Sequence, residues 1–122
     1  MASTILLIDD DDDLRHAVTL VLSTEGHTVL TAPNGAVALE VLRGAAVLPL
    51  VILLDLRMPV MNGWQFRETQ LLDPRIAGIP VVVFTADRLA ASGIAGASCF
   101  LAKPLELNEL VTTVARFAAG VR

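Results

Sequence analysis

The sequence predicts an α/β domain built on a doubly wound, five-stranded parallel sheet. Short apolar runs alternate with segments of helical periodicity along the chain, which is the pattern of parallel strands joined by crossover helices. The first run is apolar without alternation, as expected for a strand that is covered on both faces. With 122 residues, of which 54% are hydrophobic, the chain is expected to form one domain, residues 1–122, around a sizeable core.

Each element follows from a local pattern. Gly26 and Gly44 suit the ends of the first two helices, and Asn34 suits the start of the second. The expected strands cover residues 4–8, 27–31, 50–54, 79–84 and 97–101. The first three expected helices cover residues 12–26, 36–43 and 63–72. A last helix carries an apolar stripe made of Leu107, Leu110, Val111, Val114 and Phe117.

The acidity of the chain is a local feature. The chain has 13 acidic and 9 basic residues, and five of the acids are consecutive, from Asp9 to Asp13. No basic patch is visible, so we expect no direct binding to nucleic acid. Asp11, Asp12 and Asp13 are expected only to stabilise the positive end of the helix that follows, with Asp12 as its cap.

Two further features concern location. The longest uncharged stretches, such as residues 89–102, are shorter than the roughly 20 apolar residues of a membrane-spanning helix. The N-terminus lacks the basic segment of a secretory signal, and the single cysteine, Cys99, excludes an internal disulfide. We therefore expect a cytoplasmic protein with no membrane partner.

Reactive residues follow four of the expected strands. They are Asp9 and Asp10 after the first strand, Asp55 after the third, Thr85 and Ala86 after the fourth, and Lys103 after the fifth. In a parallel sheet these positions share one edge, where doubly wound folds place their ligand sites. Three carboxylates at that edge would repel one another, and a hard cation such as Mg²⁺ resolves the conflict. With a lysine and a hydroxyl beside them, they predict transfer of a phosphoryl group to an aspartate.

The chain resembles the receiver domains of two-component response regulators, including those of chemotaxis. The matching segments occur in the family's order and cover essentially the whole chain. They are Ile5-Leu6-Leu7-Ile8-Asp9-Asp10, Asp55-Leu56-Arg57-Met58-Pro59, Met61-Asn62-Gly63, Val83-Phe84-Thr85-Ala86 and Lys103-Pro104. The resemblance implies the flavodoxin-like receiver fold, with strand order 2-1-3-4-5.

The resemblance also implies a role for each site residue. Asp55 is the phosphoacceptor and contributes to the Mg²⁺ site. Asp10 binds Mg²⁺ directly, Asp9 binds it mainly through a water molecule, and Arg57 binds it through the backbone carbonyl.

The remaining roles concern the phosphoryl group and the switch. By the resemblance, Lys103 pairs with a phosphoryl oxygen, Thr85 donates a hydrogen bond to another, and the small Ala86 leaves room for the group. Thr85 is also a switch residue together with Phe100, which matches the family's aromatic switch position. The Lys103–Pro104 peptide bond is typically cis in relatives.

In function, the resemblance implies the phosphoacceptor receiver of a phosphorelay. A sensor histidine kinase or a phosphotransfer protein would donate the phosphoryl group in a Mg²⁺-dependent reaction, and a downstream protein or an output domain would receive the signal. Such a domain is a signalling switch that catalyses only its own aspartyl phosphorylation and dephosphorylation.

The interval from Thr85 to Lys103 departs from the family pattern. It is about four residues shorter than the resemblance leads us to expect, which is roughly one helical turn. We therefore expect a shortened fourth helix. Because that helix contributes to the surface through which relatives dimerise, we expect the isolated domain to be a monomer.

Three other classes of protein remain as alternatives. Asp9-Asp10-Asp11 after an apolar strand also suits a phosphatase of the haloacid-dehalogenase type, but this would leave Asp55 unexplained. A flavodoxin-type redox or nucleotide-binding domain would need a glycine-rich or hydroxyl-rich phosphate loop after the first strand, which is missing. A receiver that acts only as a scaffold usually lacks an acidic residue or the lysine, and here both are present.

Overall fold

The computed structural model describes residues 3–86, 94 and 96–120. Its strands are β1 (Thr4–Ile8), β2 (Thr28–Ala32), β3 (Val51–Leu54), β4 (Val81–Thr85) and β5 (Cys99–Ala102). Its helices are α1 (Asp12–Thr24), α2 (Gly35–Gly44), α3 (Gly63–Leu71) and α5 (Leu107–Ala118). The five predicted strands, the first three predicted helices and the last one are therefore found, with ends that differ by one or a few residues.

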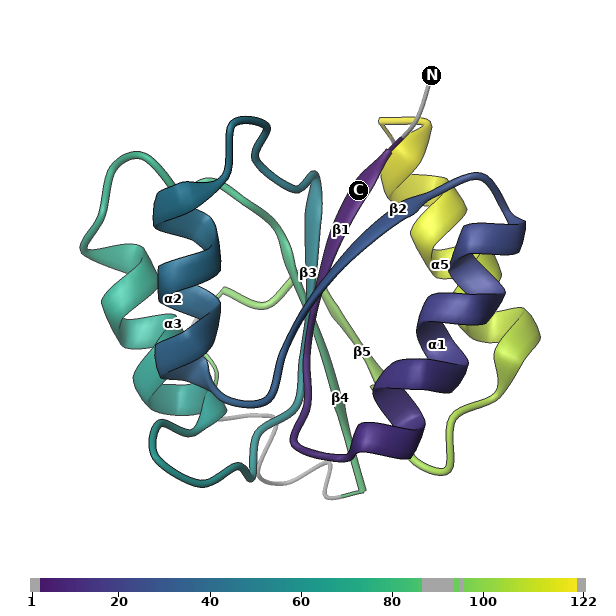
Figure 1. Cartoon of the computed structure of the whole chain (residues 1–122), viewed down its shortest axis with the longest axis horizontal. Coiled ribbons are helices and arrows are strands. Elements are labelled where there is room, and N and C mark those ends of the chain that lie inside the picture. Colours follow the sequence, from purple (N-terminus) through teal and green to yellow (C-terminus); the bar gives the residue numbers. More distant parts are fainter. Residues whose placement is uncertain (1–2, 87–93, 95, 121–122) are drawn as a thin grey trace.

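The sheet is parallel throughout and has the order β2-β1-β3-β4-β5, as predicted. Helices α2 and α3 cover one face and helices α1 and α5 cover the other (Figure 1). The core therefore has two halves, because β1 sends Leu6 and Ile8 to the α2–α3 side and Ile5 and Leu7 to the α1–α5 side. This arrangement confirms the doubly wound fold.

Helix starts are set by side chains that accept backbone hydrogen bonds. Asn34 accepts from the N–H of Val37 at 3.0 Å and caps α2, as predicted. The prediction that Asp12 caps α1 is wrong. Asp11 caps that helix and accepts from the N–H groups of Asp13 and Leu14 at 3.0 and 3.1 Å. Asp12 already has helical backbone, so it lies one position too late for the capping role.

The predicted shortening of the fourth helix concerns residues 87–95, and all of these except Ile94 lie outside the described residues. In the described part, no helix is long and apolar enough to span a bilayer.

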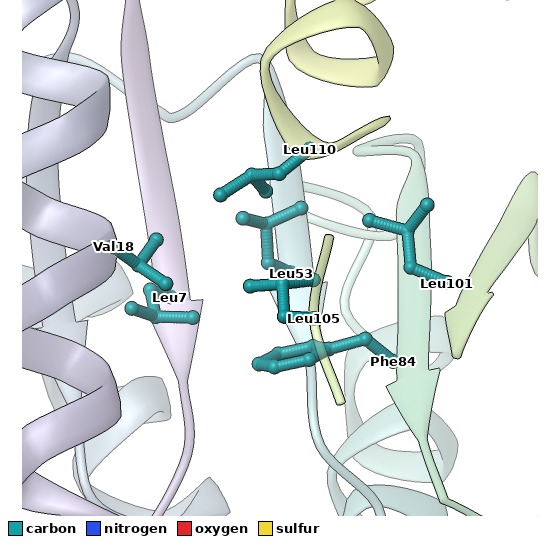
Figure 2. A pocket seen from close by; sticks show the side chains of 7 residues that line it. All are labelled: Leu7, Val18, Leu53, Phe84, Leu101, Leu105 and Leu110. Atoms are coloured by element: carbon teal, nitrogen blue, oxygen red, sulfur yellow. The ribbon is translucent and has the colours of Figure 1, made fainter. Parts of the chain in front are cut away.

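The α1–α5 half of the core contains a small space that is enclosed only by apolar side chains (Figure 2). They are Leu7, Val18, Leu53, Phe84, Leu101, Leu105 and Leu110. The space among them is too small to hold a water molecule, so we assign it to core packing. Phe84 connects this half of the core to the functional edge of the sheet, because the Lys103 ammonium lies 4.9 Å from its ring centroid.

Candidate functional site

The backbone of the sheet places three of the predicted site residues directly. The N–H of Asp9 donates to the carbonyl of Ala32, that of Asp55 to Ile8, and that of Lys103 to Thr85, at 2.9 to 3.0 Å. Each of these bonds extends the parallel ladder by one residue beyond a strand end. The site residues are therefore fixed by the sheet itself, at the lower edge in Figure 1.

The three carboxylates that the sequence places at this edge do meet. One carboxylate oxygen from each of Asp9, Asp10 and Asp55 lies within 4.8 Å of the other two. Asp9 is fully buried, Asp55 is 6% exposed and Asp10 is exposed. The group thus reaches from the interior to the surface, so an ion or a phosphoryl group can approach it from outside.

Lys103 neutralises part of this charge. Its Nζ donates to Asp9 Oδ2 at 3.0 Å and lies 3.4 Å from Asp55 Oδ1. The Lys103–Pro104 peptide bond is cis, as the resemblance implied. The Lys103 ammonium therefore forms ion pairs with two buried carboxylates, those of Asp9 and Asp55, whereas the third carboxylate, that of Asp10, is exposed.

The pKa values of Asp55 and Lys103 are both raised. Burial raises the pKa of Asp55 and the negative charge of Asp9 adds to this, while Lys103 and the N–H of Leu56 oppose it. For Lys103, burial alone would lower the pKa, but the hydrogen bond to Asp9 and the charges of Asp55 and Asp9 outweigh that effect. At this edge the charged form of the Asp55 carboxylate is therefore disfavoured, and the charged form of the Lys103 ammonium is favoured.

These residues line a hollow of about 400 Å³, which we call the acid hollow. Its lining consists of Asp9, Asp10, Asp11, Asp55, Arg57, Thr85, Ala86 and Lys103. It therefore includes every residue that the sequence assigned to phosphoryl transfer or to the metal.

Within the acid hollow, Thr85 is buried and Ala86 is exposed. The exposed Arg57 side chain stands over Trp64, with its Cζ 5.6 Å from the ring centroid. Phe100 is the one predicted site residue outside the hollow. It is 45% exposed on β5 and lines a separate depression with residues of α5, so it faces outward in this structure.

Two residues that support the site were given no role in it by sequence reasoning, although Gly63 belongs to one of the matching segments. Arg15 of α1 reaches back to β1, where its Nη1 donates to the carbonyl of Asp9 at 2.6 Å, and its Nη2 pairs with Asp12. Gly63 starts α3 against the end of β3, and a Cβ at this position would lie 2.5 Å from the carbonyl oxygen of Asp55. Their contacts with Asp9 and Asp55 are to backbone carbonyls, so no pairing of side chains in the sequence predicts those contacts.

The oxygen-only donor set fits a hard divalent cation. Magnesium favours carboxylate oxygens from one or two residues with several retained waters, and the exposed Asp10 leaves space for those waters. Both carboxylate oxygens of Asp9 already accept a hydrogen bond, which leaves fewer lone pairs for a cation. Oδ1 accepts from the N–H of Asp11 at 2.8 Å, and Oδ2 accepts from Lys103. Asp10 and Asp55 are therefore better placed than Asp9 to bind a cation directly.

Comparison with known proteins gives a consistent picture. The family model "Response regulator receiver domain" matches residues 5–115. The chain is 36% identical over 115 residues to the Escherichia coli transcriptional regulatory protein GlrR. This match covers 90% of this chain and 25% of GlrR. The chain is also 31% identical over 120 residues to Protein PilH of Pseudomonas aeruginosa. This match covers 95% of this chain and 98% of PilH.

A solved structure agrees with these sequence matches. A putative response regulator from Chloroflexus aurantiacus has a TM-score of 0.88 and 30% identity, over 98% of this chain and 99% of that one. The chain spans only about a quarter of the length of GlrR and of Response regulator protein FleR of Pseudomonas aeruginosa, but nearly all of PilH. The chain belongs to the receiver domain family of two-component response regulators.

Proposed function

We propose that Asp55 accepts a phosphoryl group and that residues 1–122 act as one receiver domain of a phosphorelay. The observation that carries this proposal is the meeting of Asp55 with Asp9, Asp10 and Lys103 in the acid hollow. Buried carboxylates that are close together reduce the stability of a fold, so their presence at one open edge favours a functional reason.

In the proposed reaction, one carboxylate oxygen of Asp55 attacks phosphorus in line and forms an acyl phosphate. The P–N bond of a phosphohistidine, or the P–O bond of a small acyl phosphate, breaks and its electron pair leaves with the departing group. Lys103 then donates to one phosphoryl oxygen, and the Thr85 hydroxyl donates to another. The backbone N–H of Ala86 completes the set at the exposed side of the hollow.

Mg²⁺ would be held by the carboxylates of Asp10 and Asp55, by Asp9 through water and by the carbonyl of Arg57, and it would supply positive charge to the transferring group. The chain's own part in this is to hold those oxygens close together. The backbone hydrogen bonds at the strand ends hold them there.

The partners follow from the same chemistry. We propose a sensor histidine kinase or a phosphotransfer protein as donor, a downstream protein or an output domain as receiver of the signal, and a cytoplasmic location. GlrR is a transcriptional regulatory protein, but the matched part is only a quarter of it, so we propose no nucleic-acid contact for these residues themselves.

The test is phosphorylation by acetyl phosphate or phosphoramidate. We expect one base-labile phosphoryl group for each chain, dependent on Mg²⁺ and absent from Asp55→Asn. The matched control is Asp13→Asn, because Asp13 is an exposed acid in the first turn of α1 and does not line the hollow. Undiminished labelling of Asp55→Asn would overturn the assignment, and so would equal loss in both variants.

A further inference from the structure

Val60 has a backbone conformation that valine rarely adopts. Its φ is +69°, and among the described residues it is the one non-glycine residue with a positive φ. The N–H of Met61 donates to the carbonyl of Pro59 at 2.8 Å, which closes a three-residue γ-turn around Val60. This form of the γ-turn is strained, and a β-branched side chain adds to the strain.

The folded chain gains little packing from this side chain in return. Val60 is 82% exposed, so most of its apolar surface meets water. Glycine or asparagine would fit the turn at lower cost and would not expose apolar surface. A strained residue with an exposed apolar side chain is a reason to look for a contact outside the chain.

The position of Val60 indicates where that contact lies. The loop from Asp55 to Gly63 leaves the end of β3 and returns to it, because the N–H of Gly63 donates to the carbonyl of Leu56 at 2.9 Å. Val60 is three residues from Gly63 and so lies within roughly 10 Å of it. Gly63 in turn abuts Asp55. The loop lies at the same edge as the turn between β1 and α1 (Figure 1).

The turn is also held in place before any partner arrives. The N–H of Gly35 donates to the carbonyl of Met61 at 2.9 Å, and the Met61 side chain packs close to Gly35. A contact residue that is fixed in advance loses little conformational entropy when it is buried by a partner. Pro59 beside it is exposed and rigid, which extends the same apolar tip.

We propose that Pro59 and Val60 form an apolar docking tip for the protein that delivers the phosphoryl group to Asp55. Asp55 is only 6% exposed, so a donor histidine must enter the acid hollow while the body of its protein covers the rim. The acid hollow that the donor must enter is lined in part by exposed acids, Asp10 and Asp11. The complementary donor surface has an apolar depression for Val60 and a basic or neutral surround near the phosphohistidine. This inference rests on the proposed function.

The test compares a protein donor with a small one. The histidine kinases of the genome that encodes this chain are purified as cytoplasmic fragments, autophosphorylated with labelled ATP and mixed with the chain one at a time, and the fastest donor is kept. Val60→Ala removes two methyl groups, and Val60→Thr keeps the branched shape but replaces one methyl group with a hydroxyl. We expect each to raise KM for the phosphorylated kinase about tenfold and to leave kcat nearly unchanged.

The controls separate docking from damage to the site. Val47→Ala changes a valine that is 68% exposed in the connection before β3, at the opposite edge of the sheet, and should leave the KM unchanged. Labelling by acetyl phosphate should be equal in wild type and in the Val60 variants. Val60→Gly, which relaxes the turn, should show the same rise in KM with a Tm at least as high as that of wild type.

Each other outcome overturns the inference. An unchanged KM in Val60→Ala and Val60→Thr would show that no donor surface contacts the tip. Equal loss with acetyl phosphate would show that Val60 acts through the geometry of the acid hollow. If wild type were not labelled by acetyl phosphate at all, the proposed function would fail first, and that failure is visible without any Val60 variant.

Discussion

The repulsion among the three carboxylates should be measurable as stability. Asp10→Asn removes one negative charge and keeps the shape of the side chain. The carboxylate oxygens of Asp10, Asp9 and Asp55 lie within 4.8 Å of one another, so Asp10 takes part in two repulsive pairs. At the dielectric constant of water, each pair costs about 0.9 kcal/mol, and two cost about 2 kcal/mol. Screening and the loss of attraction to Lys103 reduce this gain, so we expect a stabilisation of about 1 to 2 kcal/mol.

The assay is urea and thermal unfolding at neutral pH, first in EDTA. For a domain of this size, a stabilisation of 1 to 2 kcal/mol raises Tm by about 4 to 8 °C. The increase should shrink in 1 M KCl, where the Debye length falls to about 3 Å. The matched control Asp13→Asn lies outside the carboxylate group and should change Tm much less.

Magnesium should reverse the order of the two proteins. At one hundred times its Kd, a ligand of the native state adds about 2.7 kcal/mol to the wild type, which exceeds the expected gain of Asp10→Asn. Asp10→Asn has lost a proposed direct ligand and should respond little. If Asp10→Asn is no more stable than wild type in EDTA, or if it keeps the full Mg²⁺ response, the account of this edge as a repulsive cation site is wrong.

Three further predictions concern single features of the edge. Gly63→Ala should destabilise the fold by about 1 to 3 kcal/mol and slow acetyl phosphate labelling, because the new Cβ would lie 2.5 Å from the carbonyl oxygen of Asp55; unchanged unfolding and labelling would contradict this. The raised pKa of Asp55 means that the folded chain binds this proton more tightly than the unfolded chain. The contribution of Asp55 is therefore most favourable below its unfolded pKa and is lost as pH rises through its folded pKa, so metal-free Asp55→Asn should gain stability over wild type with rising pH in unfolding curves; a constant difference would refute the sign. If Phe100 is the switch, a beryllofluoride complex should draw Thr85 toward Asp55 and turn Phe100 inward from its present 45% exposure; crystal structures with one rotamer in both states would exclude this switch.

Sequence reasoning found β1, β3 and β4 because their apolar runs are almost completely buried. It placed their ends less well. Residues 79 and 80 were expected in β4, which starts at Val81, since Pro80 has no N–H to give to a ladder. Likewise His27 precedes β2, which begins at Thr28. The end of a strand depends on its neighbour's register, and a single sequence does not contain that information.

Helix α3 shows a second limit. Its buried side includes Arg67 and Gln70, which are 7% and 0% exposed. Gln70 Nε2 donates to the carbonyls of Ile76 and Ile79 at 3.0 and 3.1 Å, and Arg67 Nη1 donates to Gln70 Oε1 at 2.8 Å. Polar residues in a helix are normally assigned to the solvent side, and only the folded chain brings these carbonyls to them. The same reason explains why Arg15 was not recognised, whereas the carboxylates and Lys103 were found because a parallel sheet necessarily brings strand ends together.

The arrangement of Lys103 suggests how a charge at Asp55 would reach the output side of the sheet, if Asp55 is phosphorylated as proposed. The ammonium is shared between Asp9 at 3.0 Å and Asp55 at 3.4 Å. A phosphoryl group adds about two negative charges at Asp55, so the balance of this sharing must shift toward Asp55. The backbone N–H of Lys103 donates to the carbonyl of Thr85 at 3.0 Å, and the registers of β4 and β5 place Thr85 opposite Ala102. Both groups that would contact the phosphoryl oxygens therefore belong to one hydrogen-bonded pair of strands, and this pair also carries Phe100. A displacement of Thr85 or Lys103 toward the phosphoryl group would therefore move β4 and β5 together. In this way the added charge at Asp55 would change the position of the exposed side of β5.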